Sequence, residues 1–389
     1  MTTIDLVYFD AGGGHRAAAR ALQQAIAEQR RPWRVRLVQL ADVLDPGRRW
    51  RTRTGIDPEA FYNTRLAQGR TLGFAHGLRA LQALIRLSHR PMRQALEQHW
   101  LRSEPDLVVS LVPNFNRVLC ESLARTLPGV PFTTVMTDMA DLPPRFWIER
   151  GQVQHLVCGT PQALAQARRA GHADPHLWLT SGMVLDPSFY RAPPVDREQE
   201  LAALGLDPSR PTGLVLFGAQ GSMQMLSIAR RLDGHQLLLM CGRHTRLADA
   251  LRALPRRAPH AVVGFTPEVA RHMALADYFI GKPGPASLAE ALHMGLPVLT
   301  FLNAWTMPQE RWNAGWIAAQ GLGRVVRSPR ALPAAVDEVL ANLPALRRRV
   351  AAIDNRAVFE LPQILADILA TAARPPRGLP ALQPEEVLR

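Results

Sequence analysis

Apolar and polar positions are patterned most clearly between residues 276 and 313. Two short apolar runs, 278–280 and 296–302, have the length of buried strands, and the residues between them favour a helix that ends at Gly295. Four glycine and proline residues fill the turn before this helix: Gly281, Pro283, Gly284 and Pro285. Such a turn brings the backbone close to whatever lies above it. The pattern predicts strand, tight turn, helix, strand and loop.

Strands and helices alternate through most of the chain. The pattern predicts strands at 4–9, 35–40, 107–112, 132–136, 155–158 and 212–217, and helices at 17–29 and 355–370. This alternation is typical of doubly wound α/β domains. A chain of 389 residues is long for a single core, so we predict two such domains.

Composition indicates a soluble protein of the cytoplasm. The hydrophobic share of 47% is that of a globular protein. No apolar run reaches the ~18 residues that span a bilayer. The chain starts with a predicted strand and lacks a basic leading segment, so we expect no signal peptide. Three cysteines lie far apart without metal-ligand spacing and suggest buried thiols: Cys120, Cys158 and Cys241.

The net charge of +13 is concentrated in residues 30–93. This segment holds 14 arginines and 4 acidic residues, interleaved with aromatic and aliphatic positions. Such a mixture favours an amphipathic surface on an anionic membrane, where each arginine contributes roughly 1 kcal/mol. The alternative is a solvated helical face whose apolar residues lie in the core. No nucleic-acid-binding motif accompanies the charge, so we expect no nucleic-acid partner.

The same Gly/Pro segment carries the polar groups of a nucleotide-sugar site. A helix that starts after Gly284 and Pro285 offers N–H groups to a phosphate, and Ser287 or the turn itself can cap it. Three further side chains suit a ribose diol and sugar hydroxyls: Glu290 in the helix, then Gln309 and Glu310 after the next strand.

A second glycine loop begins where the strand 212–217 ends. Gly218, Gly221 and Ser222 form a small turn before a helix, which places N–H groups around a diphosphate. Arg243 follows another apolar run and can line the same cleft. The alternative is an ordinary strand-to-helix turn.

The first glycine loop follows the strand 4–9 and consists of Gly12, Gly13 and Gly14. The pattern Gly-x-Gly-x-x-Gly is absent, which disfavours NAD. His15 lies at a helix N-terminus, whose dipole disfavours the protonated imidazole, so a neutral His15 suits a general base. The alternative is a capping histidine that only orders the loop.

Asp138 follows the buried strand 132–136, at its carboxyl end. A carboxylate at this place can orient His15 or take a proton itself. The alternative is an aspartate that only caps a turn.

Two stretches resemble a known family. GKPGPASLAEAL (281–292) and PQERWN (308–313) resemble the donor-binding signature of GT-B glycosyltransferases. These include monogalactosyldiacylglycerol synthase, processive diacylglycerol glucosyltransferases and the peptidoglycan N-acetylglucosaminyl transferase. Five residues match the diacylglycerol branch: Lys282, Glu290, Gln309, Glu310 and Asn313. Lys282 is the single lysine of the chain, which supports a specific role, whereas Leu-Pro-Pro at 142–144 replaces the family's Cys-His-Pro and puts the acceptor in doubt.

The resemblance implies a GT-B fold, with two Rossmann-like domains facing a cleft. It implies an acceptor and membrane-binding domain at 1–188, a nucleotide-sugar-binding domain at 189–354 and a helix at 355–370 that packs back on the first domain. Residues 375–389 then form a flexible tail. The resemblance also places backbone around Phe265 at uracil, Glu290 at ribose, and His15 with Asp138 at the acceptor.

The activity implied is inverting transfer of a hexose from a UDP-sugar to a lipid hydroxyl, such as that of diacylglycerol. We expect the enzyme on the inner face of the cytoplasmic membrane. It needs no metal or other cofactor, since no Asp-x-Asp motif or His/Cys cluster with metal-ligand spacing is present. The alternatives are another acceptor (a polyprenyl lipid, a glycan or a small molecule), a UDP-sugar epimerase, or nucleotide binding without catalysis. The residues do not separate glucose from galactose donors.

Overall fold

The computed structural model describes residues 1–10, 13–47, 74–191 and 195–372. Three sequence predictions lie partly or wholly outside these ranges: Gly12, the middle of the basic segment 30–93 and the tail at 375–389.

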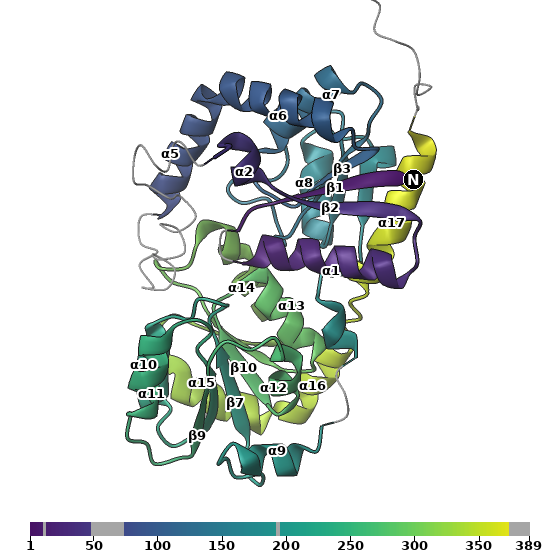
Figure 1. Cartoon of the computed structure of the whole chain (residues 1–389). Helices are drawn as coiled ribbons and strands as arrows, with labels where there is room; N and C mark the ends of the chain where they lie inside the picture. The colour runs from purple at the N-terminus through teal and green to yellow at the C-terminus, as the bar shows by residue number, and fades with distance from the viewer. Residues whose placement is uncertain (11–12, 48–73, 192–194, 373–389) are drawn as a thin grey trace, which may run out of the picture.

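The first half of the chain forms a parallel sheet with the strand order β2-β1-β3-β4-β5-β6 (Figure 1). Helices cover both faces, because α1 and α17 pack into one core cluster and α6 and α7 into another. The strands are β1 (Thr2–Tyr8), β2 (Trp33–Gln39), β3 (Leu107–Ser110), β4 (Phe132–Val135), β5 (His155–Cys158) and β6 (Leu177–Leu179).

The second half forms another parallel sheet, with the order β12-β11-β10-β7-β8-β9. Its strands are β7 (Thr212–Leu216), β8 (Gln236–Met240), β9 (His260–Val263), β10 (Tyr278–Gly281), β11 (Val298–Phe301) and β12 (Gly323–Val326). Every residue of β7, β8, β10 and β11 is buried, as expected for strands of a parallel sheet that is covered on both faces. The prediction of two doubly wound α/β domains is confirmed.

The helices follow the strands in the order expected for doubly wound domains. In the first half they are α1 (Gly14–Glu28), α2 (Leu40–Leu44), α5 (Phe74–Leu87), α6 (His89–Ser103), α7 (Asn116–Thr126) and α8 (Pro161–Arg169). In the second half they are α9 (Arg197–Ala203), α10 (Gln224–Arg231), α11 (Thr245–Arg252), α12 (Val269–Ala274), α13 (Pro285–His293), α14 (Arg311–Ala319), α15 (Leu332–Ala341), α16 (Leu343–Ala351) and α17 (Ala357–Thr371).

The helix predicted from residue 17 begins earlier, at Gly14. Gly13 acts as its N-cap in the left-handed conformation, with φ 84°, which a glycine adopts without strain. His15 therefore lies in the first turn of α1 rather than in the loop before it.

Each sheet has one point where the strand order reverses, between β1 and β3 in the first and between β7 and β10 in the second. Ligands of open α/β sheets lie at such switch points, beyond the carboxyl ends of the strands. The loops that leave β7 and β10 start at Phe217 and Lys282, so both predicted donor loops meet at the second switch point.

The last helix, α17, returns to the first half of the chain. Leu361, Leu365 and Ile368 are fully buried in the core beneath β1 and α1. The two chain crossings between the halves are tied together, because Asn355 Nδ2 donates to the carbonyl of Met183 at 2.9 Å. The C-terminal helix is therefore part of the N-terminal core.

We predict that Leu365→Ala lowers the free energy of unfolding of the N-terminal domain by roughly 2–5 kcal/mol, because it leaves a cavity in a packed core. Leu101→Ala is the matched control: this leucine of α6 is 62% exposed, and its loss should cost less than roughly 0.5 kcal/mol. Denaturant unfolding combined with hydrogen exchange of the β1 amides measures both. Equal effects of the two substitutions would contradict this role of α17.

Candidate functional site

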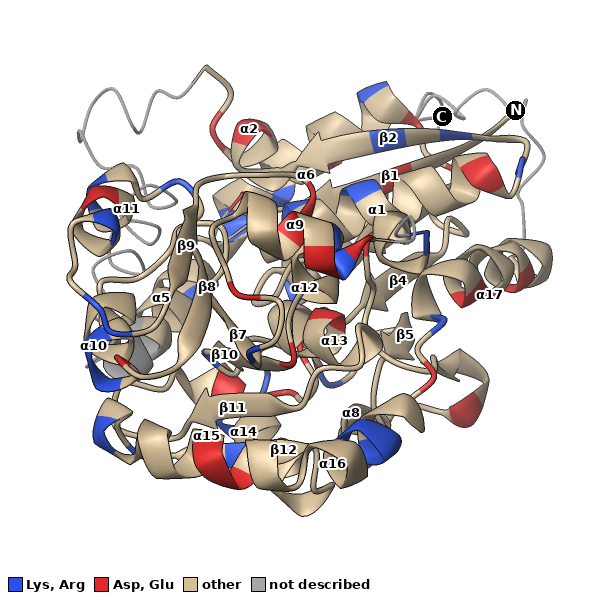
Figure 2. Ribbon diagram, turned by 90° about the horizontal axis from the view of Figure 1, so that it is seen from below, with Lys and Arg blue, Asp and Glu red and all other residues tan. Residues whose placement is uncertain are grey.

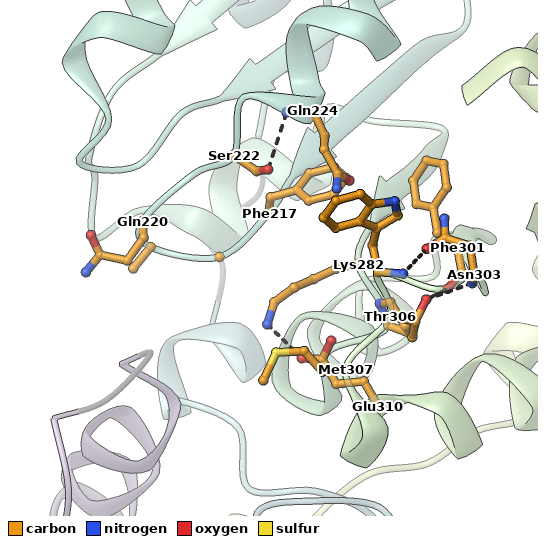
Figure 3. A pocket seen from close by; sticks show the side chains of 14 residues that line it. Phe217, Gln220, Ser222, Gln224, Lys282, Phe301, Asn303, Thr306, Met307 and Glu310 are labelled. Atoms are coloured by element: carbon orange, nitrogen blue, oxygen red, sulfur yellow. Dashed lines mark hydrogen bonds and ion pairs between the residues drawn. The ribbon is translucent and has the colours of Figure 1, made fainter. Parts of the chain in front are cut away.

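A pocket lies at the second switch point, between the loops that leave β7, β10 and β11 (Figure 3). It combines aromatic, amide, hydroxyl and charged groups with exposed backbone. Its lining residues are Phe217, Gly218, Ala219, Gln220, Ser222, Gln224, Lys282, Pro283, Phe301, Asn303, Trp305, Thr306, Met307 and Glu310.

The glycines of the β7 loop are required by close backbone packing. Gly221 has φ 63°, and a Cβ there would lie 2.4 Å from the carbonyl oxygen of Cys241. Gly218 is also left-handed, with φ 74°. The adjoining β8 loop is held to this turn because the N–H of Arg243 donates to the carbonyl of Ala219 at 2.9 Å. Two loops thus pack backbone against backbone at the mouth of the pocket.

Lys282 and Glu310 form an ion pair in the pocket, with Nζ 2.7 Å from Oε1 (Figure 3). Glu310 is only 5% exposed, whereas Lys282 is partly open to the pocket. A Cβ on Gly284 would lie 3.3 Å from Lys282 Cε and 3.4 Å from Glu310 Oε1. Glycine at this position therefore leaves room for the pair and for anything that approaches it.

The N-terminus of α13 carries no side-chain cap. Gly284 is the N-cap, Pro285 is the first helical residue, and Ser287 is buried in the first turn without capping it. Of the two alternatives expected, Ser287 or the turn itself, the structure has the turn, with Gly284 at the N-cap position and no side-chain cap. Because no side chain occupies the first N–H groups, they are available to an anion.

Gln309 and Asn313 each present a buried oxygen, Oε1 and Oδ1, that has no hydrogen-bond partner within the described ranges. Asn313 is fully buried, and its Nδ2 donates to the carbonyl of Pro283 at 2.8 Å, so it also holds the turn before α13. Unpaired buried polar atoms are costly, and a hydrogen-bond donor that reached these oxygens would remove that cost. An amide acceptor suits a sugar hydroxyl.

Glu290 lies on α13 with its carboxyl enclosed by protein. Burial raises the pKa of this carboxyl to about 7, and the negative charge of Asp186 adds to the shift. A ligand that donates hydrogen bonds to this carboxyl stabilises its ionised form, and a ribose diol can donate such bonds.

Arg243 and Phe265 lie together at the outer side of this half-site. The guanidinium carbon is 3.7 Å from the centre of the phenyl ring, a cation–π contact, and Phe265 is 55% exposed. An exposed aromatic ring next to a cation offers a surface for a planar base.

His15 lies in the first turn of α1, next to the carboxyl end of β1. Its Nδ1 lies 3.0 Å from Oγ1 of Thr137. Burial lowers the pKa of His15 to about 4, and a hydrogen bond to the carbonyl of Leu111 opposes this shift only partly. The imidazole is therefore neutral near pH 7, and the cause is burial, whereas the prediction rested on the helix dipole. Gly14 beside it is exposed.

Asp138 is the second acid–base candidate of the first half. Its Oδ2 accepts a hydrogen bond of 2.8 Å from the indole Nε1 of Trp147. Burial raises the pKa of the Asp138 carboxyl to about 7, while the Trp147 bond lowers it; the charge of Glu310 raises it further and that of Lys282 opposes. The charges of Glu310 and Lys282 in the second half of the chain thus affect the pKa of Asp138 in the first half.

The structure gathers most of the residues named from the sequence into these two half-sites. His15 and Asp138 are not hydrogen-bonded to each other in the described part of the chain, because each has another partner. Sequence reasoning missed Trp147, and it missed Trp305, which follows β11 and lines the pocket. Trp305 could have been found as an aromatic residue beyond a strand's carboxyl end. Trp147 reads only as part of an apolar run.

Comparison with known proteins relates the second half of the chain to a glycosyltransferase family. Residues 214–364 match the glycosyltransferase family 28 C-terminal domain. The chloroplast monogalactosyldiacylglycerol synthase of Spinacia oleracea is 26% identical over 361 residues, which cover 85% of this chain and 64% of that protein. These matches support the resemblance to the GT-B glycosyltransferases that include monogalactosyldiacylglycerol synthase. This chain thus spans less than two thirds of the length of the Spinacia oleracea protein.

Solved structures show the GT-B fold and confirm that prediction. MurG of Acinetobacter baumannii superposes with a TM-score of 0.58 at 12% identity, covering 94% of this GT-B chain and 100% of MurG. A Listeria monocytogenes protein assigned as a UDP-N-acetylglucosamine 2-epimerase superposes with the same TM-score at 13% identity, covering 95% and 96%. The GT-B fold alone does not separate a transferase from an epimerase.

Among the residues that the structure describes, no group of three or more His, Cys, Asp or Glu side chains could hold a metal ion.

We predict that Asp138→Asn raises thermal stability at pH 8 but not at pH 4. The pKa of Asp138 is about 7 in the native state against an ordinary 3.8, so native Asp138 stays protonated where the unfolded chain ionises. Its contribution to stability is therefore present below pH 4 and is lost as the pH rises to about 7. Asparagine avoids this loss.

The expected gain in melting temperature at pH 8 is roughly 2 °C or more. Asp367→Asn on α17 is the matched control: this aspartate is exposed, so we expect no pH-dependent gain. Calorimetry at the two pH values measures both. A gain of the same size at pH 4 would show that the substitution acts through packing and not through ionisation.

Proposed function

We propose that the protein is a glycosyltransferase that moves a hexose from a UDP-sugar to a lipid hydroxyl such as that of diacylglycerol. One observation carries the proposal: an uncapped helix N-terminus with an adjacent Lys282–Glu310 pair in the second half faces a buried carboxyl, Asp138, in the first half. The helix N-terminus with the Lys282–Glu310 pair suits a sugar diphosphate. The buried carboxyl of Asp138 suits proton transfer from an acceptor.

The donor is proposed to lie along the second switch point. Its diphosphate meets the N–H groups of α13, the β7 loop at Gly218–Ser222 and the ammonium of Lys282. Glu290 accepts from the ribose hydroxyls, and Gln309 with Glu310 binds the sugar. The base lies at the backbone around Phe265, beside Arg243. Because the helix N-terminus and Lys282 stabilise the leaving diphosphate, the reaction is proposed to need no metal.

Asp138 is the better proposed base. A general base works best when its pKa lies near the working pH, and the pKa of Asp138 is about 7 whereas that of His15 is about 4. Asp138 takes the proton of the acceptor hydroxyl as its oxygen attacks the anomeric carbon. The bond from that carbon to the diphosphate oxygen breaks, its electron pair leaves with UDP, and the anomeric configuration inverts. His15 then orders the acceptor loop and excludes water.

A UDP-sugar epimerase is the second candidate, favoured by the equal structural likeness to the Listeria protein. An epimerase changes the sugar without a second substrate. It therefore requires no acceptor path into the cleft, and the two activities differ in whether an added lipid is consumed.

The proposed lipid path is supported by α5 (Phe74–Leu87). Three leucines on one side of this helix are exposed: Leu81, Leu84 and Leu87. On its other side, Leu78 packs against the cluster that contains Trp147, and Gln82 Nε2 donates to Asn114 Oδ1 at 3.0 Å. An apolar face is thus held directly beside the proposed acceptor groups. This geometry suits a peripheral enzyme that draws its acceptor from a bilayer surface, here proposed to be the inner face of the cytoplasmic membrane.

Charge supports this docking less strongly than the sequence indicated. Arg36 pairs with buried Asp5 at 2.6 Å, and Arg93 pairs with Glu97 at 3.3 Å, so these arginines of the basic segment have internal partners. Figure 2 also shows basic residues outside the segment, on α8 and α10. The exposed leucines of α5 are the firmer support. No helix in the described part of the chain is long and apolar enough to cross a membrane.

We predict that the protein releases UDP from one UDP-hexose only when diacylglycerol is present in mixed micelles. Product analysis should show a glycolipid with inverted anomeric configuration. Asp138→Asn should lower kcat/KM about 10²–10⁴-fold, the usual share of a general base, with UDP affinity unchanged. His15→Ala should also lose turnover and keep UDP affinity.

Asp367→Asn is the control and should keep full turnover. Release of UDP that ignores the lipid would contradict a lipid acceptor, and a change of the sugar without UDP release would favour the epimerase. Loss of UDP binding in His15→Ala would make that loop structural.

A separate prediction concerns the membrane. The protein should sediment with anionic vesicles at low salt and be released at high salt, because screening weakens the attraction of exposed arginines. Leu87→Asp should weaken the binding, since Leu87 is 85% exposed at the end of α5. Val153→Asp, 84% exposed and outside the segment, is the matched control. Binding that is equally strong in both variants would contradict docking through α5.

A further inference from the structure

Trp147 contacts both acid–base candidates, although nothing in the sequence assigned it a role. Its indole Nε1 donates to Asp138 Oδ2 at 2.8 Å. Its ring centre lies 5.9 Å from that of His15, with the planes inclined by 53°. The side chain is fully buried. One rigid aromatic residue therefore adjoins the two groups that the reaction needs.

We propose that Trp147 is a positioning residue for proton transfer: its N–H holds Oδ2 of Asp138 and leaves Oδ1 to receive the acceptor's proton. This inference rests on the transferase activity proposed above. Within the described ranges, the indole is the hydrogen-bond partner of the Asp138 carboxyl. The carboxyl is therefore oriented by Trp147 and not by His15.

The loop that carries Trp147 is fixed on both sides of the indole. The backbone N–H of Trp147 donates to Asp141 Oδ1 at 2.7 Å, and its carbonyl accepts from Asn116 Nδ2 at 3.0 Å. Asn116 is itself held by Ser110, whose hydroxyl donates to Asn116 Oδ1 at 2.6 Å. A residue anchored in this way can hold a reactive group without relaxing during the reaction.

Indole has a specific advantage at this place. The indole N–H donates a hydrogen bond but cannot accept one. It therefore stabilises the ionised carboxylate at Oδ2 and cannot accept a hydrogen bond from a protonated Oδ2. Its apolar ring at the same time excludes water, which favours the neutral acid. The two effects oppose each other and keep the proton affinity of Asp138 near neutrality, where a base can both accept and release a proton.

Trp147→Phe tests this directly, because phenylalanine keeps an aromatic ring and removes the N–H. Loss of a hydrogen bond to the carboxylate should move the acidic limb of the kcat/KM profile to higher pH by about one unit. Because the N–H also orients Oδ2, turnover above that limb should remain below the wild-type value. Trp178→Phe is the matched control, since Trp178 donates to His155 Nδ1 at 3.4 Å away from the site; its profile should match the wild type.

A second measurement does not need the phenylalanine variant, and the titration itself needs no activity. The chain holds eight tryptophans, so a ¹⁵N-labelled sample gives at most eight indole N–H signals. One signal should shift with a midpoint near pH 7, and this titration should vanish in Asp138→Asn. Its midpoint should coincide with the acidic limb of the wild-type profile.

The outcomes distinguish a failure of the proposed function from a failure of the proposed role of Trp147. Absence of UDP release by the wild type with every sugar and lipid would overturn the proposed function. In an active enzyme, an unmoved acidic limb in Trp147→Phe would overturn the role of Trp147. If Trp147→Phe does not fold, the absence of an indole signal whose titration depends on Asp138 overturns it instead.

Discussion

The parallel order of the strands is the constraint on which the site depends. All strands of a parallel sheet end at the same edge, so every strand-to-helix loop of a domain emerges on one side. The two halves turn these edges toward each other, and a Cβ on Gly13 would lie 3.9 Å from that of Ala219. The charges of Lys282 and Glu310 therefore reach Asp138 from the opposite domain. The return of α17 into the N-terminal core holds the chain to this arrangement.

The cleft contains buried polar groups that destabilise the free protein and that a ligand would supply with hydrogen bonds. Asp138 and Glu290 are carboxyls enclosed by protein, and Gln309 and Asn313 each hold a buried oxygen without a partner in the described part of the chain. Each such group costs stability, and all of them lie where polar chemistry is proposed. Surrounding cores built from continuous apolar strands, such as β7, supply the stability that these groups remove.

The sequence allowed prediction of features that depend on local pattern. Buried strands, the helix after Gly284 and the glycine loops follow from periodicity and from backbone freedom, so their places were predicted to within a few residues. Features that depend on distant contacts were not predictable. Trp147 reads as core in its own loop, and its role arises only because the chain folds it against Asp138 and α1. The sequence also left open whether Ser287 or the turn itself caps the helix, and in the structure Gly284 occupies the N-cap position without a side-chain cap.

Lys282 gives the molecule an unusual chemical handle. It is the single lysine of the chain, so besides the N-terminal amine only one side-chain amine is present for an amine-selective reagent. That amine is paired with Glu310 at the centre of the candidate donor pocket. Covalent labelling of the intact protein would thus report on one defined place, and anything that occupies the pocket would show itself as protection of a single residue.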